Sequence, residues 1–288
     1  MTYAYYPGCS LETTAKGYDM SMRAVCEHLG VELVDIPDWN CCGAVPAASV
    51  DPALSATLSA RILRQTRDAG ADVIVAPCSG CYKYIRRSRE SLLDDPGLAT
   101  HVMHLLGVDQ LGPFPTIEHP LETLTRELDA VVQSVQRPLK GLRVACYYGC
   151  LISRPRGGFD DPEDPMSMDH LMQAVGAQTV PYRYKTRCCG GAVLMPSPDL
   201  AFDMTDVVLQ KALDQGANCL VLACPLCALL LDTYQGHIGR HSGKRYDLPV
   251  LYFTQLMGMA MGIDEKRLGL RYNVTEPFTL FKKVGLKE

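Results

Sequence analysis

The 288-residue sequence lacks the features that mark several common classes of protein. Its net charge is −4 and no stripe of Lys or Arg runs along it, so we expect neither nucleic acid nor an anionic membrane as a partner. The longest apolar run, residues 219–231, is too short to span a bilayer, so we expect no integral membrane protein. The N-terminus, MTYAYYPGC, has no basic segment followed by an apolar one and is not typical of a signal peptide.

Motifs for common redox cofactors are also missing. No GxGxxG follows a predicted strand, and the basic stretch GHIGRHSGKR at 236–245, which we interpret as a loop, has the wrong spacing for a phosphate-binding loop. The chain contains no run of four closely spaced cysteines of the ferredoxin type. We therefore expect neither a flavin nor a nucleotide in this chain, and no electron relay of its own.

Cysteine, by contrast, is abundant. The chain has 13 cysteines, and without a predicted leader we expect it in the cytoplasm, where thiols stay reduced. Many thiols in a reducing compartment favour metal or redox chemistry over a disulfide framework.

The cysteines belong to an internal repeat. YAYYPGC, ending at Cys9, matches VACYYGC, ending at Cys150; NCCGAV at 40–45 matches RCCGGAV at 187–193. GADVIVAPCSGC, ending at Cys81, matches GANCLVLACPLC, ending at Cys227. Because the three matching segments occur in the same order in both halves, they indicate two copies of one domain. We place the copies at 1–139 and 140–288, joined within residues 112–141, a stretch that contains several prolines and is expected to be helical. Residues 264–288 form a C-terminal tail, which we interpret as either a docking arm or a terminus that wraps the surface.

Each copy alternates predicted strands and helices. The first copy is expected to contain strand 3–6, helix 13–29, strand 31–36, helix 52–69 and strand 72–76. The second is expected to contain strand 143–147, helix 167–175, strand 179–184, helix 198–215 and strand 219–223. This order predicts an α/β fold of two pseudo-symmetric domains, each a small parallel sheet flanked by helices, with cysteines at the carboxyl edge of the strands.

That edge gathers five thiols in each copy. Ligands bind at the carboxyl edge of open α/β sheets, and helix N-termini there favour anionic thiolates. Glycines after the adjacent cysteine pairs, Gly43 and Gly190, allow turns in which both sulfurs reach one centre. A four-iron cluster or a structural zinc ion needs four ligands, so one thiol is in excess. It could bridge irons, stay free as a nucleophile or be accidental.

Three cysteines fall outside the repeated pattern. Cys26 lies in a predicted helix and Cys219 in a predicted buried strand, and we interpret both as core residues. Cys146 aligns with Tyr5 of the first copy and is expected in the core or behind the second set of thiols.

The pattern Cys-x31-Cys-Cys-Gly-x34-Cys-x2-Cys and its repeat resemble the cysteine-rich CCG domain family. Over nearly its whole length, including YYPGC, DWNCCGA and YKTRCCGG, the chain resembles the family of heterodisulfide reductase B subunits. The resemblance implies two noncubane [4Fe-4S] clusters, with the adjacent pair of cysteines supplying a bridging thiolate. The implied ligands are Cys9, Cys41, Cys42, Cys78 and Cys81 for one cluster and Cys150, Cys188, Cys189, Cys224 and Cys227 for the other.

The same resemblance implies the reduction, or formation, of a disulfide by one-electron steps, with a ferredoxin-like C subunit and a flavin-containing A subunit as partners. Two alternatives stay open: an electron-transfer component of a quinone-linked lactate, glycolate or succinate dehydrogenase, and a zinc-stabilised scaffold. His170 is a candidate proton donor and Lys185 a candidate contact for a substrate anion, although a surface or packing role suits His170 and solvation suits Lys185. The disulfide or thiol substrate is not identified by the sequence.

Overall fold

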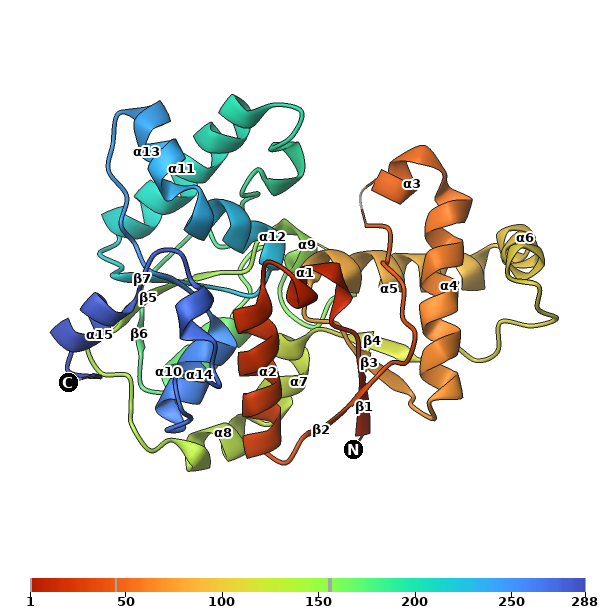
Figure 1. The fold of residues 1–288 in the computed structure, drawn as a ribbon, viewed down its shortest axis with the longest axis horizontal. Coiled ribbons are helices and arrows are strands. Elements are labelled where there is room, and N and C mark those ends of the chain that lie inside the picture. The colour runs from red at the N-terminus through yellow and green to blue at the C-terminus, as the bar shows by residue number, and fades with distance from the viewer. Residues whose placement is uncertain (1, 45, 155–156, 288) are drawn as a thin grey trace.

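The computed structural model describes residues 2–44, 46–154 and 157–287, and contains two parallel four-stranded sheets (Figure 1). The strands of the first sheet are β1 (Thr2–Tyr5), β2 (Glu32–Asp35), β3 (Val73–Val75) and β4 (Thr116–Glu118). Those of the second are β5 (Arg143–Tyr147), β6 (Gln178–Thr179), β7 (Cys219–Leu222) and β8 (Val250–Tyr252). The strand orders, β2-β1-β3-β4 and β6-β5-β7-β8, are equivalent. The predicted α/β class with two pseudo-symmetric parallel sheets is therefore confirmed.

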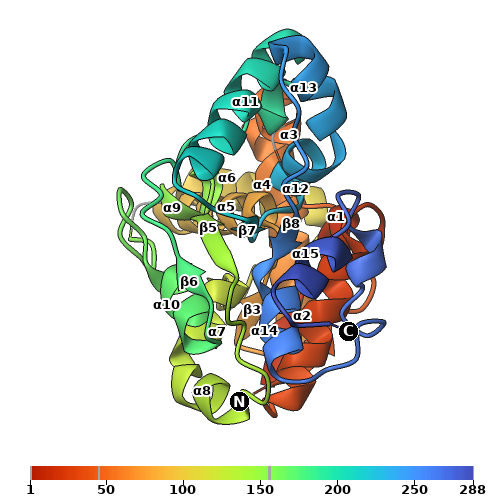
Figure 2. The same cartoon turned by 90° about the vertical axis from the view of Figure 1, so that its left-hand side faces the viewer.

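Helices connect the strands and cover the sheets (Figures 1 and 2). In the first half they are α1 (Gly8–Glu12), α2 (Lys16–His28), α3 (Pro46–Val50), α4 (Pro52–Asp68), α5 (Ser79–Asp94), α6 (Pro96–Leu106), α7 (Pro120–Arg126) and α8 (Leu128–Ser134). In the second half they are α9 (Cys150–Ser153), α10 (Ser167–Ala174), α11 (Pro198–Asp214), α12 (Pro225–Ala228), α13 (Gln235–Ser242), α14 (Phe253–Ala260) and α15 (Phe278–Lys283). Single turns are η1 (Gly191–Val193), the π-helical η2 (Leu229–Thr233) and η3 (Leu270–Tyr272).

The structure differs from the predicted elements in several respects. Each sheet has a fourth strand, β4 or β8, that was not predicted, because three residues are too short to show alternation and these two strands, unlike β3, lie outside the repeated segments. The predicted strand 179–184 is reduced to β6, because Pro181 has no N–H to continue the ladder. Residues 236–245, interpreted as a loop, include most of α13.

The two halves exchange helices to close their cores. α14, which follows β8, packs on α2 of the first half, and α7, which follows β4, packs on α10 of the second (Figure 2). At the first of these contacts the rings of Tyr18 and Tyr252 stack with centroids 4.3 Å apart, and the hydroxyls of Ser21 and Thr254 lie 2.7 Å apart. One buried cluster consequently contains apolar side chains of both halves. The domain boundary at 139/140 stays a prediction; it falls between α8 and β5.

The C-terminal tail wraps the surface. The backbone N–H groups of Val274 and Thr275 donate to the carboxylate of Asp232 at 2.7 and 2.8 Å. Arg267 pairs with Glu27 of the first half, and Phe281 in α15 is buried. Of the two interpretations of the tail, these contacts favour the surface-wrapping terminus over the docking arm.

Candidate functional site

The five first-half cysteines of the repeated pattern converge at the carboxyl edge of the first sheet. Cys9 lies in α1, Cys41 and Cys42 lie in the loop after β2, and Cys78 is the N-cap of α5 with Cys81 in its first turn. The Sγ atoms of Cys42 and Cys81 are 3.3 Å apart. Cys41 contacts Cys42, Cys78 contacts Cys81, and Cys9 lies close enough to Cys41 to act on its charge. We call these five thiols the first cysteine site.

The second cysteine site repeats this arrangement. Cys150 opens α9, Cys188 and Cys189 precede η1, and Cys224 is the N-cap of α12, which contains Cys227. The Sγ atoms of Cys189 and Cys227 are 3.4 Å apart. Cys188 contacts both Cys150 and Cys189, and Cys224 contacts Cys227. The topology thus brings together, in two groups of five, all ten cysteines that the sequence singled out.

A buried tyrosine fixes the loop before each adjacent pair. The hydroxyl of Tyr6 donates to the carbonyl of Asn40 at 2.7 Å, and that of Tyr147 donates to the carbonyl of Arg187 at 2.6 Å. Both rings are fully buried, and both acceptors directly precede the first cysteine of a pair. Each pair is therefore tied to the end of the first strand of its own sheet.

Glycine before Cys9 and Cys150 allows the backbone to approach a thiol. Gly8 and Gly149 have φ values of +66° and +73°. A Cβ atom would lie 3.0 Å from Cys81 Sγ at Gly8 and 3.2 Å from Cys227 Sγ at Gly149. Any side chain at either position would occupy space beside the thiols. Glycine is therefore required at both positions for its backbone conformation and for the space it leaves free.

Backbone N–H groups point at the thiols of the adjacent pairs. Gly43 N donates to Cys41 Sγ, and Gly190 N and Gly191 N donate to Cys188 Sγ and Cys189 Sγ, all at 3.4 Å. Gly43 and Gly190 have φ values of +70° and +90°, as their predicted turn role requires. Such N–H donors favour the thiolate, which is the form that binds metals.

The two sites interlock. α1, which carries Cys9, packs on α12 of the second site, and α9, which carries Cys150, packs on α5 of the first (Figure 1). Ser79 Oγ donates to the carbonyl of Ala223 at 3.3 Å. His119 Nε2 lies 3.1 Å from the carbonyl of Pro77 and also bonds to the backbone of Ala223. These contacts join residues next to Cys78 to Ala223, the residue before Cys224, so the two sites are linked by direct contacts.

Thiol contacts lower the pKa of one cysteine in each adjacent pair. Hydrogen-bond contacts with Cys41 and Cys81 lower the pKa of Cys42 to about 4. Hydrogen bonds from Cys150 and Cys189 lower the pKa of Cys188 to about 2. In each site the contacts between neighbouring thiols therefore favour the thiolate form of one cysteine of the adjacent pair.

The three remaining cysteines are buried away from these contacts. Cys26, Cys146 and Cys219 are at most 1% exposed, as the sequence predicted for core residues. Burial raises the pKa of Cys26 to about 12 and raises the pKa values of the other two as well. They stay protonated and pack as small apolar side chains.

Lys185 is neither solvated nor directed at the thiols. It is 5% exposed, and its Nζ lies 3.3 Å from Asp169 Oδ2 and donates to the carbonyl of Pro165 at 2.8 Å. Tyr148 completes the group by donating its hydroxyl to Asp169 at 2.7 Å. The carbonyl of Lys185 accepts hydrogen bonds from the N–H groups of Tyr148 and Gly149. Lys185 thus braces the segment before Cys150, and solvation, the simpler prediction, is wrong.

His170 lies on the exposed face of α10. It lines a surface hollow together with Glu122, Arg126 and Phe159, and none of the described residues that line this hollow is a cysteine. The structure therefore does not bring His170 to the cysteine sites, and the surface role suits it better than proton donation.

The donor set of each site fits an iron–sulfur cluster. Among the described residues, no group of three or more His, Cys, Asp or Glu side chains surrounds a point where one metal ion could sit. A cluster differs from a single ion in that its ligands are spread over several irons. Five thiols gathered at one sheet edge, most of them in contact with a neighbouring thiol, and glycines that keep side chains out of the space beside the sulfurs suit such a group.

Comparison with known proteins agrees with this interpretation of the sites. The model of a cysteine-rich domain family, CCG, matches residues 3–86 and 144–232. The chain belongs to the CCG family. Both matched segments contain one complete set of five cysteines, so the family match follows the internal repeat.

Two curated relatives match over almost the whole chain. The 8-methylmenaquinol:fumarate reductase membrane anchor subunit of Wolinella succinogenes is 33% identical, over 95% of this CCG chain and 97% of that protein. The B subunit of the Ferredoxin/F(420)H(2)-dependent CoB-CoM heterodisulfide reductase of Methanosarcina acetivorans is 28% identical, over 97% and 95%. The resemblance to heterodisulfide reductase B subunits is thereby confirmed, and the CCG chain is similar to subunits of oxidoreductase complexes.

A solved structure supports the fold. A hypothetical protein from Helicobacter pylori superposes with a TM-score of 0.78 at 15% identity, covering 96% of this CCG chain and 52% of that one. Although one relative is named a membrane anchor, no helix in the described part of this chain is both long and apolar enough to cross a bilayer.

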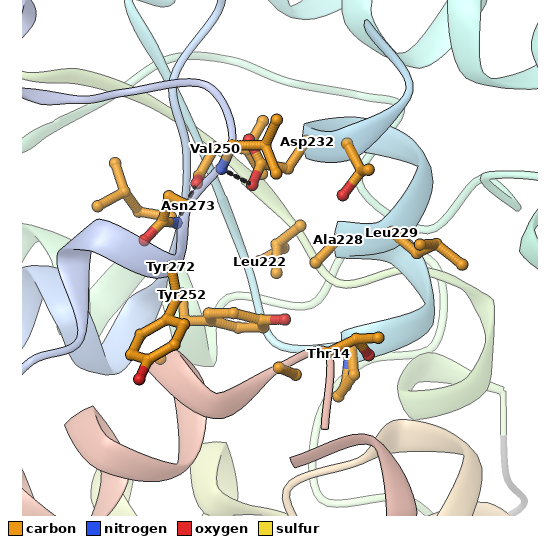
Figure 3. Close-up of a pocket in the computed structure, with 15 residues that line it drawn as sticks. Thr14, Leu222, Ala228, Leu229, Asp232, Val250, Tyr252, Tyr272 and Asn273 are labelled. Atoms are coloured by element: carbon orange, nitrogen blue, oxygen red, sulfur yellow. Dashed lines mark hydrogen bonds between the residues drawn. The ribbon is translucent and has the colours of Figure 1, made fainter. Parts of the chain in front are cut away.

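The sequence reasoning missed the residues between the two sites. Tyr18 and His119 are fully buried there, and Tyr252 nearly so. Tyr252 also lines a cavity of about 60 Å³ between the α1–α2 connection and the second half, and its hydroxyl points into that cavity (Figure 3). The cavity is bounded by Thr14 on one side and Ala228 on the other (Figure 3). Only the exchange of helices between the halves brings these residues together, and no local pattern reports it.

Proposed function

We propose that this chain is the iron–sulfur subunit of a heterodisulfide reductase-like complex, and that it reduces or forms a disulfide in one-electron steps at two noncubane [4Fe-4S] clusters. The observation that carries the proposal is the pair of interlocked five-thiol sites. Cleaving a disulfide takes two electrons, whereas an iron–sulfur cluster exchanges one at a time. Two equivalent sites that share a boundary therefore suit a reaction that needs two electrons better than they suit a simple electron conduit.

The proposed ligands divide between the two sites. The first cluster would be held by Cys9, Cys41, Cys42, Cys78 and Cys81, and the second by Cys150, Cys188, Cys189, Cys224 and Cys227. In each site the adjacent pair would supply the thiolate that bridges irons, which accounts for the fifth thiol. The rest of the chain fixes these thiols and keeps side chains out of the space beside them, through Tyr6, Tyr147 and the glycines before Cys9 and Cys150.

The electrons must come from other subunits, because the sequence has no ferredoxin-type cysteine run and no dinucleotide motif. We propose a ferredoxin-like C subunit and a flavin-containing A subunit as partners, in the cytoplasm. The support is that several relatives are named as subunits of heterodisulfide reductases.

A second candidate rests on the Wolinella relative, whose name describes a methylmenaquinol:fumarate reductase subunit. In this alternative the chain passes electrons between a quinone pool and a dehydrogenase of the succinate, lactate or glycolate type. The same two clusters would then serve as a conduit, and no disulfide would bind to them.

Electron paramagnetic resonance on the anaerobically purified protein separates the two candidates. If the chain acts on disulfides, adding a thiol to the oxidised protein changes the cluster signal, and reduced viologen drives cleavage of a small-molecule disulfide. If it is a conduit, the signal is indifferent to thiols, viologen drives no cleavage, and the complex oxidises a menaquinol analogue instead.

Paired variants test the ligand assignment. Cys41→Ser should lose iron from one site, whereas Cys26→Ser, which alters a buried thiol outside both sites, should keep the iron of both. Equal iron content in the two variants would contradict the proposed ligands.

A further inference from the structure

The hydroxyl of Tyr18 has no hydrogen-bond partner in the described part of the chain, although the side chain is fully buried. Buried polar groups are nearly always hydrogen-bonded, because leaving one unsatisfied costs its full desolvation. Tyr6 and Tyr147, the corresponding buried tyrosines beside each site, both bond to a backbone carbonyl. Tyr18 is therefore an exception that requires an explanation.

The ring of Tyr18 packs against two aromatic side chains, and both cysteine sites lie nearby. Its ring stacks on Tyr252 at 4.3 Å, with the planes 8° apart, and meets Phe253 edge-on at 6.1 Å. Tyr252, on which it stacks, lines the same cavity as Pro225, which lies between Cys224 and Cys227 of the second site. Burial raises the pKa of the Tyr18 phenol well above its ordinary value, and the charges of Cys224 and of Cys78 in the first site raise it further. Tyr18 consequently stands at the junction of the two sites, held rigidly by a stack that joins the two halves.

We propose that Tyr18 is a positioning residue whose hydroxyl donates its hydrogen bond to a sulfur of an iron–sulfur cluster bound at this junction. The inference rests on the proposed clusters and names a residue that sets their properties. A bound cluster would supply the acceptor that residues 2–44, 46–154 and 157–287 do not offer, since its sulfide and thiolate sulfurs accept hydrogen bonds.

Such a hydrogen bond has a measurable consequence. Reduction adds negative charge to the cluster, and a donor aimed at its sulfur stabilises the reduced form more than the oxidised one. Tyr18 should therefore raise the reduction potential of the cluster it contacts. A purely structural tyrosine would affect folding but leave the potential unchanged.

The test compares Tyr18→Phe with Tyr5→Phe in the full-length, cluster-loaded protein, by redox titration monitored by electron paramagnetic resonance. Tyr5 is the matched control, because it is equally buried and its hydroxyl donates to Asp19 at 2.8 Å. We expect Tyr18→Phe to lower the reduction potential of at least one cluster at full iron and sulfide content. Tyr5→Phe should lower stability without shifting either potential. Unchanged potentials in Tyr18→Phe would overturn the inference.

Tyr18→His keeps the test decisive if the phenylalanine variant does not load, because an imidazole retains an N–H donor. If Tyr18→His binds its clusters where Tyr18→Phe does not, or has a higher reduction potential than Tyr18→Phe, the donor role is supported. Equal cluster content and equal potentials in the two variants refute it. Iron and sulfide in the unmodified protein are measured first. Their absence would overturn the proposed clusters and this inference with them, whereas intact clusters with unshifted potentials would overturn only the role of Tyr18.

Discussion

Replacing Gly149 with alanine should damage the second cysteine site more than it damages the fold. Gly149 has φ +73° and ψ −177°, a region of backbone space open essentially to glycine alone. Forcing alanine into it costs about 1–3 kcal/mol. The new Cβ would also lie 3.2 Å from Cys227 Sγ, so that this thiol must shift by a few tenths of an ångström. A protein stable by about 5–15 kcal/mol survives that cost, but the thiols of the second cysteine site are displaced.

The matched control is Gly107→Ala at the end of α6. Gly107 has φ +65° and ψ +42°, and no described atom lies within 4 Å of the place that an added Cβ would take. Alanine there should cost about 1–2 kcal/mol from backbone strain alone. Urea unfolding and iron and sulfide analysis are run on both variants. We expect both to lose stability and only Gly149→Ala to lose iron. Full iron content in Gly149→Ala would refute the steric reasoning.

Three further predictions follow from contacts that support the sites. Tyr147→Phe removes the hydrogen bond to the carbonyl of Arg187 and should lower the free energy of unfolding by about 1 kcal/mol in urea titrations; no change would show that this bond does not hold the loop. Lys185→Met leaves Asp169 charged and buried and should lower the free energy of unfolding by about 3–5 kcal/mol; adding Asp169→Asn should recover part of that loss. A double variant no more stable than Lys185→Met would contradict the pairing. Residues 1–139 expressed alone should show no cooperative thermal unfolding, because α2 then lacks the cover of α14; a sharp transition would show that this half folds by itself.

The sequence could predict that the cysteines converge at the carboxyl edge of each sheet, because this depends only on the order of strands and helices along the chain. Each cysteine-bearing segment follows a strand, and parallel strands present their carboxyl ends on one side of a sheet. The structure shows why helix α4 begins where it does: Asp51 Oδ1 accepts a hydrogen bond from Ala53 N at 2.8 Å.

The relation between the two sites could not be predicted in the same way. It depends on α14 crossing to α2, on Ser79 meeting Ala223 and on His119 meeting Pro77, which are contacts between residues distant in the sequence. Lys185 shows the same limit. Because Lys185 lies close to the second cysteine pair in the sequence, its charge suggested a contact with a substrate anion. Its ion pair with Asp169 depends on tertiary packing and could not be predicted.

The central claim is that each five-thiol site holds a [4Fe-4S] cluster. The most direct test is iron, zinc and acid-labile sulfide analysis of the anaerobically purified protein. We predict about eight iron atoms and about eight sulfide ions per chain, four of each per cluster, with no zinc. Zinc in place of iron, without sulfide, would contradict the claim and favour the scaffold instead.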